Sequence, residues 1–329
     1  MRNPHPLVSI AIPTYNRAAR YLPLTLDSAL AQTYPEIEVI VSDNASSDHT
    51  TDLVLGHRDR RIRYFRQENN IGPYDNWRCC LQQARGNYFL LLHDDDLIDC
   101  DFVESCVKAA QEQRGAGVIR TGTRVIDDEG VTVWEARNQV NGLPLDEFFR
   151  AWFAGNTAWY MVSTLFRTKA LREIGGFRSR NHMVQDGVAI ALLASRHGRV
   201  DVEEVKASFR KHSGELTFAN KVTCWSEDFL CLLDLMCELT PPSKRAVLRR
   251  EGMRFFARLS FDRAAAIRSR RDRASAYRHV LKLFSYNNFP LGRLLGFDAL
   301  QRLTRRAKQK LTHTLRPGEG PVCGGLRRF

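Results

Sequence analysis

The chain has 329 residues, which is enough to bury a full hydrophobic core in one large domain or two smaller ones. Its content of 43% hydrophobic and 26% charged residues is that of an ordinary globular protein and excludes a disordered or fibrous chain. No apolar run approaches the roughly 18 residues that span a bilayer, and the N-terminus lacks the apolar core of a secretory signal, so we expect a cytoplasmic location.

Charge is distributed unevenly along the chain, whose net charge is +12. Residues 221–329 carry 23 Lys and Arg against 9 Asp and Glu, a net charge of +14, and the remainder has a net charge of −2. Such a basic segment favours a polyanionic partner: an anionic membrane surface, an anionic lipid-linked substrate or nucleic acid. Nucleic acid is disfavoured because basic and aromatic residues do not alternate regularly there. A helical appendage with solvated arginines is the alternative interpretation.

The first 120 residues alternate between strand-like and helix-like patterns. Short apolar or β-branched runs predict strands at 8–13, 37–42, 62–65 and 88–92, and apolar spacing predicts helices at 21–32, about 47–55 and 74–84. This order predicts an α/β fold with a mostly parallel sheet and helices on both faces. The loop after the first strand is no G-x-G-x-x-G, so a dinucleotide fold of the Rossmann type is not supported.

Regularity falls in the second part of the chain. The patterns predict strands at 117–120, 161–167 and 200–209, a hairpin over 124–135, and a helix over about 185–197. From residue 223 the pattern is helical almost throughout, and the Gly- and Pro-rich tail 317–329 is expected to be disordered. The eight cysteines show no C-x-x-C spacing, so neither a zinc site nor a disulfide framework is expected.

The most informative feature is a run of three carboxylates, Asp94 to Asp96, directly after the apolar strand 88–92. Adjacent carboxylates repel one another, and a divalent ion such as Mg²⁺ or Mn²⁺ with oxygen ligands would relieve the repulsion. The carboxyl ends of strands in open α/β sheets are also where ligands bind. The run therefore predicts a metal site, with a solvated acidic turn that caps the next helix as the alternative.

An ordered set of motifs resembles a known family. The segments are VSIAIPTYNR (8–17), VSDNASSD (41–48), NIG (70–72), ARGNY (84–88), HDDD (93–96), GGF (175–177), QD (185–186) and RKH (210–212). Over about residues 7–215 the chain resembles an inverting family-2 glycosyltransferase with a GT-A fold, of the bacterial polysaccharide or glycan type. It departs from the family at His93, where Asp is usual, and at Gln185, where Glu is usual.

The resemblance implies transfer of a sugar from a nucleotide-sugar donor to a hydroxyl of a glycan or lipid-linked acceptor, with Mg²⁺ or Mn²⁺ as cofactor and inversion at the anomeric centre. It also implies a nucleotide-sugar-binding half (1–100) and an acceptor-binding half of the same GT-A domain (101–220). The charge and the helical pattern indicate a third part, a basic helical extension with a disordered tail (221–329). The basic charge of that extension leaves peripheral contact with the inner face of the cell membrane open.

The resemblance assigns roles to individual residues. Asp95, Asp96 and His212 would bind the metal, with a loop histidine as the alternative for His212. The nucleotide-binding candidates are Pro13, Thr14, Tyr15, Asn16, Arg17, Asp43 and Asp94. Asp43 could instead cap the segment that follows it, and Arg17 could simply cover the sheet edge.

Asp186 is the candidate general base. A carboxylate at a helix start normally has a pKa lowered by the helix dipole, but burial beside an acceptor pocket would offset that effect. A helix cap is the alternative role. Trp152, Trp159 and Tyr160 lie between the motifs and could stack on the acceptor sugar or form part of the core.

Two other functions compete with glycosyl transfer. A nucleotidyltransferase also uses paired acids and a nucleotide, but it would need a second metal cluster that the sequence does not indicate. A catalytically inactive protein that binds nucleotide sugars or glycans is the other alternative, and the presence of Asp43, Asp95 and Asp186 argues against it. The sequence leaves the sugar, the nucleotide and the acceptor open.

Overall fold

The computed structural model describes residues 5–113, 115–212 and 221–286. The chain divides into two compact units, Met1–Val280 and Leu281–Phe329. The first unit contains the sheet and nearly all of the described helices, and the described part of the second is the end of one helix. The tail expected at 317–329 lies outside the described residues. No helix in the described part of the chain combines the length and the apolar content that a membrane span requires.

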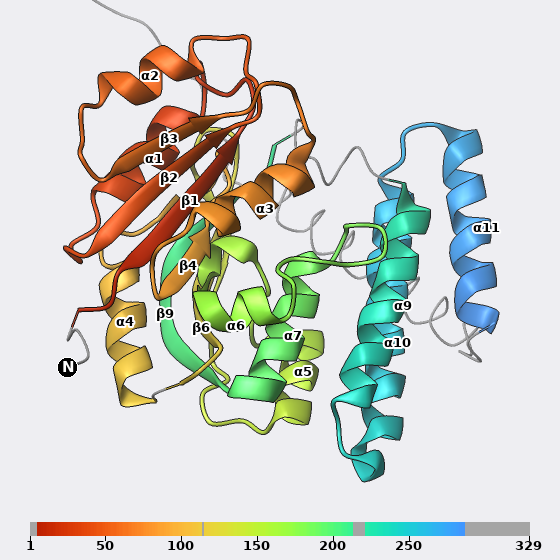
Figure 1. The fold of residues 1–329 in the computed structure, drawn as a ribbon. Coiled ribbons are helices and arrows are strands. Elements are labelled where there is room, and N and C mark those ends of the chain that lie inside the picture. The colour runs from red at the N-terminus through yellow and green to blue at the C-terminus, as the bar shows by residue number, and fades with distance from the viewer. Residues whose placement is uncertain (1–4, 114, 213–220, 287–329) are drawn as a thin grey trace, which may run out of the picture. The chain divides into compact units, whose positions relative to one another are not determined.

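The described residues form one nine-stranded sheet in the order β3-β2-β1-β4-β8-β6-β9-β5, with β7 beside β6 (Figure 1). The strands are β1 (Val8–Thr14), β2 (Ile37–Asp43), β3 (Ile62–Arg66), β4 (Tyr88–Leu91), β5 (Leu97–Ile98), β6 (Val118–Ile126), β7 (Thr132–Ala136), β8 (Thr164–Arg167) and β9 (Arg199–Arg210). The helices are α1 (Leu22–Leu30), α2 (Thr50–Gly56), α3 (Pro73–Gln83), α4 (Phe102–Glu112), α5 (Leu145–Ala154), α6 (Thr168–Glu173), α7 (Gln185–His197), α9 (Val222–Glu238), α10 (Pro242–Ala265) and α11 (Arg270–Tyr286).

The N-terminal half of the sheet is parallel, as the alternating pattern predicts. Strands β3, β2, β1 and β4 pair in parallel in that order. Every residue of β1 and β2 is buried, because helices cover both faces of this part of the sheet (Figure 1). Parallel strands bring their carboxyl ends to one edge, so the loops after β1, β2 and β4 meet there.

The second half of the sheet is mixed and departs from the expected elements. The strand expected at 117–120 and the first arm of the hairpin at 124–135 form one strand, β6. Gly122 lies within this strand without interrupting it. An added Cβ there would lie 2.8 Å from the carbonyl oxygen of Ala136, so the glycine allows β6 and the end of β7 to pack closely. Helix α5 and the short strand β5 were not predicted.

Helices α5 and α10 are joined by aromatic packing. The rings of Trp152 and Trp159 stack at 4.4 Å, and Trp152 also contacts Phe255 and Phe256 of α10 at 5.2 and 5.6 Å. Trp159 is only 5% exposed. The core alternative is therefore correct for Trp159, and its ring is unavailable for stacking on a sugar.

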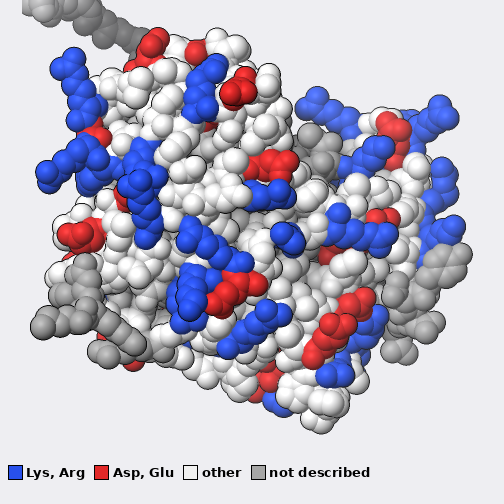
Figure 2. All heavy atoms as spheres, in the orientation of Figure 1, with Lys and Arg blue, Asp and Glu red and all other residues white. Residues whose placement is uncertain are grey.

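Basic side chains lie over α9–α11 and over the sheet-bearing part of the molecule, interspersed with acidic ones (Figure 2). In α10 and α11 the apolar residues Ala264, Ala276 and Val280 are buried. Arg270 and Arg278 of α11 are exposed, as is Arg268 between the two helices, and so are the acidic Asp262 and Asp272. The exposed surface of this region is therefore basic with acidic residues among the arginines. Contact with an anionic membrane stays a prediction.

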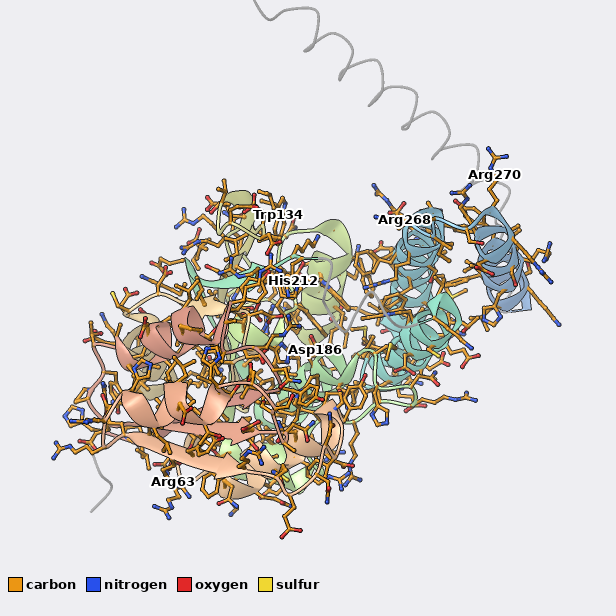
Figure 3. All side chains as sticks on the ribbon, turned by 90° about the horizontal axis from the view of Figure 1, so that it is seen from above. Arg63, Trp134, Asp186, His212, Arg268 and Arg270 are labelled. Carbon is orange, nitrogen blue, oxygen red and sulfur yellow. The ribbon has the colours of Figure 1, made fainter. Side chains whose placement is uncertain are left out.

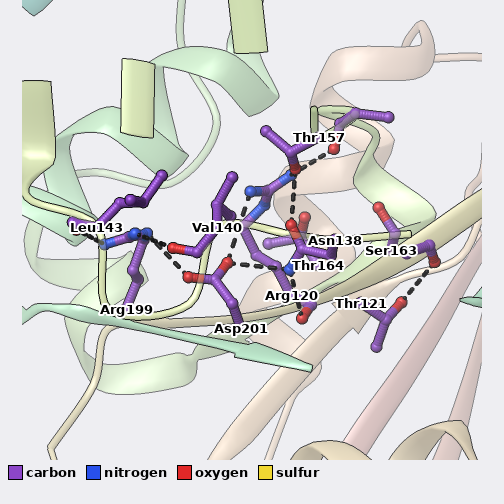
Figure 4. A network of polar contacts seen from close by, with 12 residues as sticks. Arg120, Thr121, Asn138, Val140, Leu143, Thr157, Ser163, Thr164, Arg199 and Asp201 are labelled. Carbon is purple, nitrogen blue, oxygen red and sulfur yellow. Dashed lines mark hydrogen bonds and ion pairs between the residues drawn. The ribbon is translucent and has the colours of Figure 1, made fainter. Parts of the chain in front are cut away.

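A buried polar network crosses the second half of the sheet (Figure 4). Arg120 of β6 is fully buried, and burial lowers the pKa of its guanidinium to about 10. Asp201 of β9 lies 3.8 Å from Arg120 and 3.0 Å from Arg199. Asn138 donates hydrogen bonds to Asp201 and to the carbonyl oxygen of Arg120, at 3.0 and 3.1 Å. One carboxylate thus compensates two largely buried guanidinium groups.

We expect Asp201→Asn to lower the free energy of unfolding by about 3–5 kcal/mol, because Arg120 and Arg199 would lose their buried counter-charge. Urea unfolding followed by circular dichroism measures the change. The control Lys169→Gln removes an exposed ion pair with Glu173 and should change stability by less than about 0.5 kcal/mol. Equal stability of Asp201→Asn and the wild type would contradict this account of the network.

Glu38 joins four segments at the opposite, amino-terminal edge of the parallel strands. Its carboxylate accepts hydrogen bonds from the Ser9 hydroxyl, the Arg85 N–H and the Arg63 guanidinium, each at 2.6 Å. Burial alone would raise the pKa of Glu38, but these three donors outweigh it and hold the pKa below its ordinary value. The ionised form therefore stabilises the fold.

We expect Glu38→Gln to lose about 1.5–3 kcal/mol of stability at neutral pH, where it removes charge-assisted hydrogen bonds. Because the pKa of Glu38 is lower in the folded than in the unfolded chain, its stabilisation exists above the unfolded pKa of about 4.3 and is lost as pH falls through the folded value. Urea titrations from neutral pH to about pH 3 should show the gap between wild type and variant shrinking. A gap that stays constant over this range would rule out the ion-pair contribution.

Candidate functional site

The candidate site begins where β4 ends. This strand lies between β1 and β8 in the middle of the sheet, and the buried Leu92 continues it. The chain then turns, with the N–H of Asp96 donating to the carbonyl oxygen of His93 at 3.1 Å. The hydroxyl of Thr25 in α1 donates to the carbonyl oxygen of Asp96 at 2.9 Å. A buried central strand thus delivers the acidic run to the carboxyl edge of the sheet, where loops gather.

Side chains from two distant segments form a compact cluster here. His93, Asp95 and Asp96 each offer one ligand atom, and these atoms lie within 4.8 Å of one another. His212, which follows β9, places its Nε2 atom 2.9 Å from Oδ2 of Asp95. The structure therefore brings together the three residues expected to bind metal, and adds His93 to them. Their role as ligands stays a prediction.

The carboxylates of this cluster are electrostatically crowded. Burial and the neighbouring Asp95 raise the pKa of Asp94 to about 7, and burial raises the pKa of Asp96 to about 6. Burial also acts to raise the pKa of Asp95, but the hydrogen bond to His212 and the charge of His93 outweigh it, so the pKa of Asp95 is lowered. The site therefore favours a nearby positive charge.

The donor set fits a divalent cation. Oδ2 of Asp96 and Nε2 of His93 are both buried and have no hydrogen-bond partner among the described residues. A buried polar atom without a partner costs about 1–3 kcal/mol, so each of these two atoms suggests a position that a ligand completes. Carboxylate oxygens and imidazole nitrogens are ordinary ligands of divalent metals.

Arg210 fixes the end of β9 against the acidic run. Its backbone N–H donates to Oδ1 of Asp96 at 2.9 Å, and its Nε donates to the carbonyl oxygen of Asp95 at 2.8 Å. Its guanidinium carbon lies 5.0 Å from the centre of the Tyr21 ring, which in turn packs against His212 at 4.8 Å. The backbone and side chain of Arg210 therefore position His212, two residues later, beside Asp95.

Asp128, in the turn between β6 and β7, contacts the same Tyr21. It accepts a hydrogen bond from the Tyr21 hydroxyl and one from Arg20 at 2.5 Å. Burial and the bond to Asp128 raise the pKa of Tyr21 to about 12, so the phenol stays protonated as a donor. The hairpin turn is thereby tied to the loop that follows β1.

The loop after β1 is held in a defined conformation. Pro13 and Thr14 end β1 and are buried, whereas Tyr15 is 45% exposed. Asn16 has a positive φ of 54°, its N–H donates to the Ser46 hydroxyl at 2.9 Å, and its side-chain oxygen accepts the N–H of Ser47 at 2.8 Å. Asparagine tolerates this backbone conformation better than most residues. The expected nucleotide loop is thus preformed.

Arg17 and Asp94 connect this loop to the acidic run. The N–H of Tyr15 lies 3.4 Å from Oδ2 of Asp94. The charge of Arg17 acts to lower the pKa of both Asp94 and Asp95. Arg17 therefore lies close enough to the cluster to interact with its charges. Its guanidinium would also pair with a phosphate group bound beside the cluster.

Asp43 ends β2 and is completely buried. One oxygen accepts the N–H of Ser46 at 2.8 Å, and the other accepts the Tyr64 hydroxyl at 2.6 Å with Arg66 3.5 Å away. In register it lies beside Thr14 of the nucleotide loop, as the sequence predicts. Both carboxylate oxygens already have partners within the protein, and the role in base binding stays a prediction.

Asp186 lies in the first turn of α7, at the helix start that the sequence predicts. One oxygen accepts the N–H of Gly187 at 2.8 Å. Burial raises the pKa of Asp186 despite this bond and despite the positive charges of His93 and Arg120. Figure 3 shows Asp186 and His212 in the central part of the molecule, contributed by different segments.

The segment that precedes Asp186 is anchored by helix α9. The buried carboxylate of Asp228 accepts the Ser179 hydroxyl at 2.6 Å and the backbone N–H groups of Asn181 and Met183 at 2.8 and 3.0 Å. Leu232 packs so closely that a Cβ on Gly187 would lie 2.8 Å from it. Residues 221–238 thus help to place the start of α7.

Sequence reasoning missed several residues of this site. His93 entered only as a departure from the family pattern, although its spacing of three from Asp96 could have indicated a shared turn. Arg210 stood in a quoted motif without a role. Tyr21 and Asp128 gave no local signal, because their contact joins residues 107 positions apart.

Comparison with known proteins agrees with this geometry. The family model for glycosyl transferase family 2 matches residues 9–175. Chondroitin synthase of Escherichia coli is 35% identical over 128 residues, which are 38% of this chain and 18% of that protein. An uncharacterized glycosyltransferase of Rickettsia typhi is 33% identical over 130 residues, 39% of this chain and 40% of that protein. The matched region thus spans less than half the length of these curated relatives.

Solved structures support the same fold. Residues 1–349 of Staphylococcus aureus TarS superpose with a TM-score of 0.61 at 17% identity, over 84% of this chain and 80% of that one. The mannosyltransferase PcManGT of Pyrobaculum calidifontis, in complex with GDP-Man and Mn²⁺, gives a TM-score of 0.53 at 18% identity, over 86% and 87%. The expected GT-A fold is thereby confirmed. With a family match over half of its length, this chain belongs to glycosyl transferase family 2.

Proposed function

We propose that the enzyme moves a sugar from a nucleotide-sugar donor to a hydroxyl of a glycan or lipid-linked acceptor, in a metal-dependent reaction that inverts the anomeric centre. The observation that carries the proposal is the cluster of His93, Asp95, Asp96 and His212 beside the loop after β1. Two structural neighbours support it: TarS 1–349 in complex with UDP-GlcNAc, and PcManGT in complex with GDP-Man and Mn²⁺.

On the donor side, the preformed loop from Pro13 to Arg17 would flank the nucleotide, with Arg17 pairing with a phosphate. Asp94 would contact the ribose, and Asp43 would accept a hydrogen bond from an N–H group of the base. Asp95, Asp96 and His212 would hold a Mg²⁺ or Mn²⁺ ion. When bound there, such an ion neutralises the charge that develops on the diphosphate leaving group.

On the acceptor side, Asp186 would take the proton of the attacking hydroxyl. The new bond forms between the acceptor oxygen and the anomeric carbon as the bond from that carbon to the diphosphate oxygen breaks. A single displacement from the opposite face inverts the anomeric configuration, which NMR of the product would show. The buried position of Asp186 suits a base, because desolvation makes its carboxylate more basic than an exposed one.

We propose the same three-part organisation that the sequence predicts: donor binding by residues 1–100, acceptor binding by 101–220, and a basic extension over 221–329 that contacts an anionic surface. The parallel half of the sheet supports the first assignment. The exposed basic residues of α10 and α11 support the last. Segment 213–220 lies outside the described residues.

We expect Asp95→Ala to leave the fold intact and to abolish Mn²⁺-dependent binding of UDP or GDP, because it removes the carboxylate shared with His212. Transfer should fall by roughly 10³-fold, about 4 kcal/mol of transition-state stabilisation. Calorimetric titration and release of nucleoside diphosphate measure the two effects.

The exposed Asp52 of α2 provides the control, and Asp52→Ala should match the wild type in both measurements. Full wild-type turnover in excess EDTA, with the metal content of the protein checked, would contradict the metal-dependent mechanism.

Asp186→Asn should behave differently, because it removes the base and leaves the donor site untouched. Binding of UDP or GDP with Mn²⁺ should stay within about threefold of the wild type while transfer falls by about 10²–10⁴-fold. The amide still fits the helix start, so the melting temperature serves as a check on folding. Substantial retained transfer would reassign Asp186 to a structural role.

A further inference from the structure

A groove lies at the amino-terminal edge of the parallel strands, at the opposite end of these strands from the acidic run. It is lined by residues that precede or begin β1 to β4 and has a volume of about 750 Å³. That volume falls within the range of about 300–1,000 Å³ that is typical of small-molecule sites. Neither the proposed transfer reaction nor the basic extension over 221–329 uses this groove.

Five arginines line the groove and define what we call the arginine groove. Arg58, Arg60 and Arg61 belong to the loop between α2 and β3, Arg63 belongs to β3, and Arg85 precedes β4. Basic side chains gather over this loop, at the left of the molecule in Figure 2. In Figure 3 Arg63 lies at one margin of the molecule, away from the central residues of the candidate site. Segments that are distant in sequence thus bring several guanidinium groups to one hollow.

Two of the five arginines are held in place by carboxylates of the same groove. Arg61 donates to Asp59 at 2.8 Å, and Arg63 donates to Glu38 at 2.6 Å. Each of these guanidinium groups also donates to a backbone carbonyl oxygen, at 2.9 and 2.8 Å. Their charges are therefore compensated within the protein, and their side chains form a fixed part of the groove.

The other three arginines differ from their neighbours in the same half of the chain. The guanidinium groups of Arg58, Arg60 and Arg85 form no ion pair or hydrogen bond with any residue in the described ranges 5–113, 115–212 and 221–286. By contrast, the exposed Arg20 and Arg78 each pair with a carboxylate, at 2.5 and 3.3 Å. The exposed arginines that lack a counter-charge thus meet in one groove, where their like charges repel one another.

The charge and the shape of the groove indicate the kind of ligand. Five arginines face three carboxylates there, those of Glu36, Glu38 and Asp59, so the lining has a net charge of +2. A guanidinium group offers several N–H donors in a planar fork that matches the oxygen atoms of a phosphate. A hollow surrounds a compact anion from several sides, whereas a flat membrane surface would meet only its rim.

We infer that the arginine groove binds a soluble anion with two or more linked phosphate groups, of the nucleotide or inorganic polyphosphate class. Arg58, Arg60 and Arg85 supply the uncompensated charge, and Arg61 and Arg63 supply the fixed wall. This second site is separate from the candidate site, and the inference does not rest on the proposed transfer reaction.

Calorimetric titration of the full-length protein with tripolyphosphate, in excess EDTA and at low ionic strength, tests the inference. EDTA removes divalent metal, so Mn²⁺-dependent binding at the candidate site does not contribute. The wild type should bind one tripolyphosphate per chain. The triple variant Arg58→Gln/Arg60→Gln/Arg85→Gln should bind it at least about tenfold more weakly, because three charge-assisted contacts are lost.

Two controls locate the binding. The triple variant Lys108→Gln/Arg196→Gln/Arg250→Gln removes the same charge from exposed positions of α4, α7 and α10 and should retain the wild-type affinity within about twofold. Arg17→Gln, at the candidate site, should also leave binding in EDTA unchanged. Melting temperatures measured without ligand check that the variants fold.

Chemical protection reads the contact in the wild-type protein itself. Phenylglyoxal modifies free guanidinium groups, and mass spectrometry identifies the modified residues. With tripolyphosphate bound, Arg58, Arg60 and Arg85 should react at least about threefold more slowly, because their N–H groups are engaged. The exposed Arg196 and Arg250 should react at an unchanged rate.

Several outcomes would overturn the inference. These are equal affinity of the wild type and the Arg58/Arg60/Arg85 triple variant, loss of binding in Arg17→Gln, and protection that is the same at all exposed arginines. Vesicles of phosphatidylglycerol that protect the three groove arginines when tripolyphosphate does not would overturn it in favour of a membrane contact. Each of these results leaves the proposed transfer reaction standing, because that reaction is measured at the candidate site with Mn²⁺ present.

Discussion

The candidate site of this protein depends on two contacts that join the end of β9 to the end of β4. The backbone of Arg210 donates to Asp96, and the imidazole of His212 meets Asp95, each at 2.9 Å. These pairs are 114 and 117 residues apart, so they form only when the whole sheet is assembled. They place a cationic segment directly against the acidic run, which would otherwise repel itself in a buried position.

The same contacts explain how the mutually repelling carboxylates of the acidic run are kept in a stable fold. Arg210 also reaches the carbonyl oxygens of Asp127 and Asp128, at 3.1 and 3.3 Å, and so fastens the turn between β6 and β7. That turn carries the Asp128 carboxylate that holds Tyr21. The acidic run is thus held by donors that are fixed elsewhere in the fold. Stability is supplied by distant pairs such as Asp201 with its two arginines.

The sequence predicted the elements of the parallel half well, because each strand there is a short apolar run and each helix has one apolar face. Helix α7 was predicted with its bounds, since Gln185 and Gly198 mark its ends. The second half was predicted less well. Strand β6 contains Gly122 and a charged Arg124, whose burial depends on partners in β9 and on Asp99, so its continuity could not be read locally. Helix α5 was missed although its signals are local: an apolar face, Asp146 and Glu147 in the first turn, and a left-handed Gly155 at its end.

The candidate site shows the same division between local and distant information. The acidic run and Asp186 are visible as local patterns at the end of a strand and the start of a helix. The approach of His212 to Asp95 came from the family resemblance. The contact of His93 with Trp77 requires α3 to pack against the end of β4, and the contact of Tyr21 with Asp128 requires the β6–β7 turn to fold back toward α1. Such pairings depend on tertiary geometry.

The anchoring of the segment before α7 by Asp228 has a consequence for engineering chimeric enzymes. The carboxylate of α9 satisfies two backbone N–H groups and one hydroxyl in residues 179–183, and Gly187 makes room for Leu232 of the same helix. A segment 179–187 grafted from a relative would therefore have to be accompanied by that relative's α9, or be compatible with this one. Because α10 packs on α5 through Trp152 and Phe255, exchange of the C-terminal region either near residue 220 or between α9 and α10 would separate side chains that pack together here.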